Sequence, residues 1–189
     1  MALQAPFIAP ATRPTALRAA WIALAILPAL VACAKKPRME PFLQQRDRQA
    51  YQFTQQDLAR VQFFSSSDVA VKELDGPAGA EGIVLADDDQ PGVAIESGQG
   101  WIRVRFREGA PGLVFLADPT AQGDTGYALA TEVDGGGYRL VRNDDERILR
   151  LAGRRYRVAI GAYAELVVDR EKFDQFLWAR AQKQRIDER

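Results

Sequence analysis

The chain contains no histidine and only one cysteine, Cys33. These absences exclude Ser-His-Asp triads, Cys-His nucleophiles, histidine-based zinc sites and a histidine general base. A single cysteine also allows no internal disulfide. Sites built only from carboxylates, lysine, tyrosine or serine stay open.

The sequence also lacks an excess of charge of either sign, with 25 basic and 25 acidic residues. Only Arg13 and Arg18 lie within residues 1–32, so the 157 residues from Cys33 onward carry 23 basic and 25 acidic side chains. Such a nearly neutral chain gives no electrostatic support for nucleic acid as a partner. Its length predicts one domain, large enough to bury a core without disulfides.

There is no hydrophobic run long enough to cross a bilayer. The apolar segment 19–32 has 14 uncharged residues, whereas a spanning helix needs about 20. Arg13 and Arg18 precede this segment, and Pro28 interrupts it. Residues 1–32 therefore resemble a cleavable secretory signal, cut between Ala32 and Cys33. A short membrane helix, and a secreted protein with a free Cys33 thiol, are the alternatives.

Cys33 closes the tetrad Leu30-Val31-Ala32-Cys33, which resembles the lipobox of bacterial lipoproteins. The resemblance implies that the cysteine sulfur receives a diacylglycerol and that the new amine is acylated. Two or three acyl chains would make a lasting membrane anchor. Ala34 stands where aspartate would favour inner-membrane retention. By that resemblance we expect the periplasmic face of the outer membrane, or the cell membrane in a source without an outer membrane.

After the leader, the expected organisation is a lipidated cysteine with a tether (33–50) and one β-rich domain (51–189). Pro37 and Pro41 oppose helix in the tether, and its basic residues could touch anionic head groups or simply be solvated. Thr54, with Asp57 three residues later, predicts the start of a short helix.

Strand and turn signals then dominate to residue 168. Segments expected to be strands are separated by turns and not by helices, which predicts antiparallel pairing in a small barrel or sandwich. The glycines 135–137 predict a hairpin turn. The expected strands are 69–71, 82–85, 93–95, 101–107, 112–116, 127–133, 138–141, 148–151, 154–160 and 163–168.

The last 20 residues change to a helical period. Phe173, Phe176, Leu177 and Ala181 are spaced i, i+3, i+4 and i+8, which predicts an amphipathic helix. We expect this helix to pack along the β domain, or else to bind a partner. The start of the domain, 58–71, also resembles certain uncharacterised bacterial lipoproteins, a likeness that implies no activity.

Five arginines form the candidate anion-binding face. Alternation places Arg103, Arg105 and Arg107 on one side of a strand, and Arg155 and Arg157 on one side of another. If the two strands neighbour each other, these guanidinium groups would form a patch for phosphates or carboxylates. The alternative is an outward face neutralised by nearby acids. The acidic runs 87–89 and 143–146 lack the spacing of a calcium loop, so we expect solvated turns and no metal site.

These observations favour a lipid-anchored envelope lipoprotein with a non-catalytic binding, assembly or structural role. We expect no cofactor, with the membrane as one partner and another envelope protein or peptidoglycan as a further candidate. A carboxylate-based glycan hydrolase and an apolar ligand carrier are the two rival interpretations.

Overall fold

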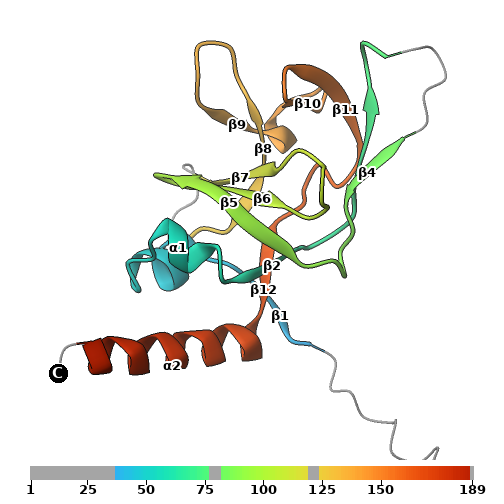
Figure 1. The fold of residues 1–189 in the computed structure, drawn as a ribbon. Coiled ribbons are helices and arrows are strands. Elements are labelled where there is room, and N and C mark those ends of the chain that lie inside the picture. The colour runs from blue at the N-terminus through green and yellow to red at the C-terminus, as the bar shows by residue number, and fades with distance from the viewer. Residues whose placement is uncertain (1–36, 77–81, 119–123, 188–189) are drawn as a thin grey trace, which may run out of the picture. The chain divides into compact units, whose positions relative to one another are not determined.

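The computed structural model describes residues 37–76, 82–118 and 124–187 (Figure 1). The expected leader, its cleavage point beside Ala32 and the lipidation site Cys33 lie outside these residues. Residues 37–189 form one compact unit.

Two antiparallel sheets form the framework of this unit. One has eight strands in the order β1-β12-β2-β5-β6-β7-β8-β9, and the other has four in the order β10-β11-β3-β4. The strands are β1 (Met39–Pro41), β2 (Gln62–Ser65), β3 (Val69–Glu73), β4 (Ile83–Ala86), β5 (Gly92–Gly98), β6 (Trp101–Arg105), β7 (Leu113–Ala117), β8 (Tyr127–Glu132), β9 (Tyr138–Leu140), β10 (Ile148–Leu151), β11 (Arg154–Ile160) and β12 (Leu166–Asp169).

Helical segments flank the sheets. They are the π-helical turn η2 (Gln44–Gln49), α1 (Gln55–Leu58), the 3-10 turn η3 (Val141–Asn143) and α2 (Arg170–Asp187). The expected mainly β fold, with a short N-terminal helix and a C-terminal helix, is confirmed. Ala128 of β8 forms an isolated bridge with Glu165, the residue before β12, but the sheets do not close into a barrel.

The ten expected strand segments correspond to β3 through β12. The glycines 135–137 have φ angles of 89°, 94° and 94°, so the predicted hairpin turn joins β8 to β9. Alternation in β6 is as expected: Ile102 and Val104 are buried, whereas Arg105 is exposed.

Residues 39–50 belong to the fold, although the sequence favoured a tether over 33–50. β1 pairs with β12, and Phe42 is fully buried. The Phe42 ring lies 5.1 Å from that of Phe63, 5.8 Å from Tyr127 and 5.7 Å from Phe173. This single side chain therefore joins the N-terminal segment, the sheet and α2 in one aromatic cluster.

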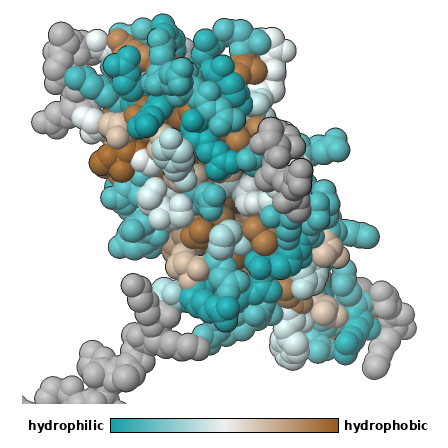
Figure 2. All heavy atoms as spheres, turned by 180° about the vertical axis from the view of Figure 1, so that it is seen from behind, coloured by the Kyte–Doolittle hydropathy of each residue, from teal (hydrophilic) through white to brown (hydrophobic). Residues whose placement is uncertain are grey.

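Helix α2 follows β12 directly and runs along the end of the molecule where β1 also lies (Figure 1). Phe173 is buried, Phe176 and Leu177 are partly buried against the core, and Trp178 is 68% exposed. No helix in the described part of the chain combines the length and the hydropathy that a membrane span requires. On the face that Figure 2 shows, apolar side chains occur as small separate patches among hydrophilic ones.

Gly161 permits a close approach between two strand connections. Its φ is +83°, and an added Cβ would lie 2.2 Å from the backbone oxygen of Asp68. Gly135 also has a positive φ, +89°, but nothing lies within 4 Å of its would-be Cβ. A substitution at Gly161 therefore adds both backbone strain and steric overlap, whereas a substitution at Gly135 adds backbone strain alone.

We predict that Gly161→Ala destabilises the domain by about 3 kcal/mol or more, because strain and overlap act together. Gly135→Ala should cost only about 1 kcal/mol, the strain alone. Urea unfolding of the two variants measures the difference. Equal losses of unfolding free energy would contradict the close approach at Gly161.

Candidate binding groove

Two adjoining hollows lie between α2 and the segment from α1 to the start of β2. Their volumes are about 230 Å³ and 520 Å³, and both are lined by Arg60 and Phe176. We call them together the α1–α2 groove. Its remaining lining residues are Thr54, Gln56, Asp57, Val61, Gln62, Asp169, Lys172, Phe173, Ala179, Arg180, Lys183 and Gln184.

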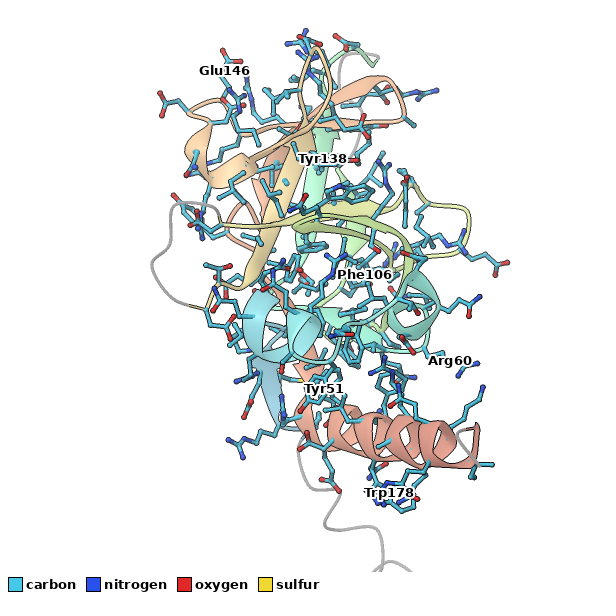
Figure 3. All side chains as sticks on the ribbon, turned by 90° about the vertical axis from the view of Figure 1, so that its left-hand side faces the viewer. Tyr51, Arg60, Phe106, Tyr138, Glu146 and Trp178 are labelled. Atoms are coloured by element: carbon cyan, nitrogen blue, oxygen red, sulfur yellow. The ribbon has the colours of Figure 1, made fainter. Side chains whose placement is uncertain are left out.

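The groove has an apolar floor and basic side chains along its sides. Val61 and Phe173 are buried and Phe176 is partly buried, whereas Arg60 and Lys183 are exposed. Arg60 lies between α1 and α2 (Figure 3). Such a surface combines contact for an apolar group with charge for an anion.

Helix α1 is placed by a capping box. The Thr54 hydroxyl accepts the Asp57 N–H, and the Asp57 carboxylate accepts the Thr54 N–H at 3.0 Å. Arg180 of α2 donates to Asp57 Oδ1 at 3.2 Å and to the Tyr51 carbonyl at 2.8 Å. Its guanidinium also stacks 5.1 Å from the Phe53 ring centre. Arg180 therefore binds α2 to the α1 segment across the groove.

Burial alone would raise the pKa of Asp57, but hydrogen bonds from Thr54 and the charge of Arg180 outweigh burial and lower it. The carboxylate is thus the stable form at neutral pH. The Asp57 carboxylate neutralises Arg180, so the other basic side chains of the groove can interact with a ligand.

The base of α2 is fixed by a second carboxylate, Asp47, whose side chain is fully buried. Asp47 accepts hydrogen bonds from the Leu43 N–H at 2.9 Å, from Arg46 at 2.8 and 2.9 Å, and from Arg170 Nη1 at 3.0 Å. Burial raises the pKa of Asp47, but these hydrogen bonds together lower it. Arg170, the first residue of α2, is thereby tied to η2.

Arg60 and Lys183 are the cations most available to a ligand. Neither side chain has a hydrogen bond or ion pair with any other residue in the described ranges. Lys172 has weak local partners, Gln62 Oε1 at 3.4 Å and Asp169 Oδ2 at 3.9 Å. An anion in the groove would meet at least two uncompensated positive charges.

The five arginines of the predicted anion-binding face lie on two different sheets. Arg103 and Arg105 belong to β6, and Arg107 follows that strand; β6 pairs with β5 and β7. Arg155 and Arg157 belong to β11, which pairs with β10 and β3. The prediction of one patch required the two arginine-bearing strands to neighbour each other. β6 and β11 do not pair, so strand pairing does not bring these guanidinium groups together.

Acidic partners neutralise some of these arginines. Arg103 pairs with Glu96 at 3.1 Å and with Glu132 at 3.0 Å, and it also donates to the Tyr138 hydroxyl at 3.2 Å. Arg107 Nη2 lies 2.6 Å from Asp87 Oδ2, in one of the acidic turns. These contacts match the interpretation of an outward face neutralised by nearby acids.

A second hollow, of about 300 Å³, lies between the β8–β9 and β10–β11 hairpins. Its lining includes several carboxylates that are bonded to arginine: Glu132 to Arg103, Asp134 to Arg150, and Asp144 to Arg139. These three carboxylates are therefore already engaged by guanidinium groups. Among the described residues, no three His, Cys, Asp or Glu side chains gather where they could hold a metal ion.

Sequence reasoning did not identify the groove. The available signal was the set Phe176, Arg180 and Lys183, which share one face of α2 at i, i+4 and i+7. The contribution of Arg60 depends on where α1 lies relative to α2, which spacing along the chain does not specify.

Comparison of the chain with protein-family models, with curated proteins and with solved structures finds no match. The groove is therefore interpreted from its own chemistry.

The Asp47 network predicts a specific pH dependence of stability. Because the folded-state pKa of Asp47 is lowered, its contribution is present above the unfolded pKa of about 3.9 and is lost as pH falls through the folded value. Asp47→Asn should lower the unfolding free energy at pH 7 by about 2 kcal/mol or more, since Arg46 and Arg170 lose their shared anion.

Acidification should then cost the Asp47→Asn variant less than the wild type. The measurement is denaturant unfolding at neutral pH and at several values below about pH 4. Identical pH profiles for the two proteins would show that Asp47 does not link folding to protonation.

Proposed function

We propose that the protein is a lipid-anchored envelope lipoprotein whose β domain has a non-catalytic binding or assembly role. The observation that carries this proposal is the tetrad Leu30-Val31-Ala32-Cys33 at the end of an uncharged segment preceded by arginines. Ala34 after the cysteine favours the outer membrane and its periplasmic face. Partners of this kind of protein include the membrane itself and other envelope components.

The place where the domain begins supports an anchoring role. Met39 already pairs with Asp169 of β12, so only five residues lie between Cys33 and the first strand. An extended chain gains at most about 3.6 Å per residue. An anchor on Cys33 would therefore hold the domain within about 20 Å of the bilayer.

A binding role is supported by the α1–α2 groove. Its apolar floor and the exposed Arg60 and Lys183 suit a ligand that carries carboxylates next to an apolar part. An acidic segment of another envelope protein and a peptidoglycan peptide both have this chemistry. A hydrolase is less well supported, because Glu132, Asp134 and Asp144 in the second hollow are bonded to arginines.

Cys33→Ala should move the protein from the membrane fraction to the soluble periplasmic fraction, because the variant has no sulfur to receive the diacylglycerol. Lys36→Ala, which alters a nearby charge but leaves the tetrad intact, is the control and should stay in the membrane. Fractionation with immunodetection measures both. Membrane retention of the Cys33→Ala variant would refute the anchor.

Reversing the groove cations should weaken capture of an anionic partner. In the double variant Arg60→Glu, Lys183→Glu, we expect at least about a tenfold loss of partner crosslinked in isolated envelopes, since two charge-assisted contacts become repulsive. Arg155→Glu, Arg157→Glu is the matched control, with the same charge change on β11. Equal losses in both variants would contradict a binding site at the groove, and a loss only in the control would favour the arginines of β11.

A further inference from the structure

Trp178 is the most unusual exposed side chain on α2. It is 68% exposed, and it points away from the β domain on the outer side of the helix (Figure 3). Arg185 and Ile186 follow at i+7 and i+8, and Ile186 is 72% exposed. The outer face of α2 thus combines an aromatic, an aliphatic and a basic residue, whereas Phe173 and Phe176 on the inner face pack on the core.

The N-terminal entry of the domain lies at the base of this same helix. The Arg170 N–H donates to the Arg38 carbonyl at 2.9 Å, and Met39 pairs with Asp169. From Cys33 to Arg38 the chain can extend by at most about 18 Å, while α2, with 18 residues, is about 27 Å long. An anchor on Cys33 therefore brings the α2 end of the molecule toward the membrane.

The residues on and beside the outer face of α2 suit the head-group region of a bilayer. Arg38, which is 77% exposed in its side chain, lies beside the start of the helix, and Arg185 is exposed on the outer face, whereas Lys172 and Lys183 line the α1–α2 groove. Two acids share the outer face: Asp174, which is paired with Arg170 at 2.9 Å, and the exposed Glu171, seven residues before Trp178. Tryptophan is favoured at the membrane–water interface, because its ring is apolar and its N–H can still reach a polar partner.

We propose that the outer face of α2 rests on the bilayer that holds the lipid anchor, with Trp178 inserted at the level of the head groups. This inference rests on the proposed lipid anchor. Helix α2 alone lacks the features of an independent membrane-binding helix, but anchoring makes its contact with the bilayer intramolecular, so a weak surface interaction is sufficient. The helix then orients the domain, with the two sheets away from the membrane.

The test uses protein purified from membranes and reconstituted in phosphatidylethanolamine–phosphatidylglycerol vesicles. Trp101→Phe leaves Trp178 as the only tryptophan after Cys33. We expect a blue-shifted Trp178 emission, quenching by lipids with brominated acyl chains, and reduced quenching by aqueous acrylamide. The proposal would be overturned if acrylamide quenched Trp178 fluorescence as strongly in vesicles as in solution without lipid or detergent.

A reporter at the other end of β12 provides the matched control. Tyr163 is 63% exposed and precedes β12, whereas α2 follows that strand. In the triple variant Trp101→Phe, Trp178→Phe, Tyr163→Trp, the new reporter should stay accessible to acrylamide and insensitive to brominated lipid. Quenching by brominated lipid at both positions would also overturn the proposal, because it would mean that the domain has no fixed orientation on the bilayer.

Mass spectrometry of the purified protein distinguishes failure of this inference from failure of the anchor. If Cys33 carries no lipid, the proposed function is wrong. A maleimide phospholipid can then be coupled to Cys33, which is the only thiol of the chain, and the same quenching measured. Protected Trp178 on this synthetic anchor would support the α2 contact by itself, and exposed Trp178 would refute it.

Discussion

The arrangement of this protein depends on the buried carboxylate of Asp47. A charge with no exposed surface is tolerated only when partners compensate it. Here Arg46 and the Leu43 N–H come from the N-terminal segment, and Arg170 comes from the first turn of α2, 123 residues later in the chain. Folding must bring these two segments together before the charge is satisfied, so the beginning and the end of the domain are fixed to each other.

That constraint gathers the features of interest at one end of the molecule. The N-terminal entry, α1, the α1–α2 groove and the outer face of α2 all lie around the helix that Asp47 and Phe42 hold in place. The two sheets supply the rigid support, through the aromatic contacts of Phe63 and Tyr127 with Phe42. Anchoring and binding, as proposed, would then be properties of the same end of the domain.

Sequence patterns predicted the strands well because β3 to β12 depend on local alternation and on turn residues such as the glycines 135–137. Residues 39–50 were missed because Pro41, Arg46 and Arg48 resemble a solvated linker, and their burial depends on pairing with the distant β12. The division of the five arginines between two sheets could not be predicted for a related reason. Alternation specifies which side chains share one strand face, but the order of strands in the two sheets depends on contacts that no local pattern contains.

Hydrogen exchange of the backbone amides of residues 42–53 in the intact protein tests the central claim most directly. If Asp47 and Phe42 make this segment part of the fold, the amides of Phe42, Asp47 and Phe53 should be protected to nearly the same degree as those of β12. Exchange at the rate of an unstructured chain in 42–53, with β12 still protected, would contradict the account.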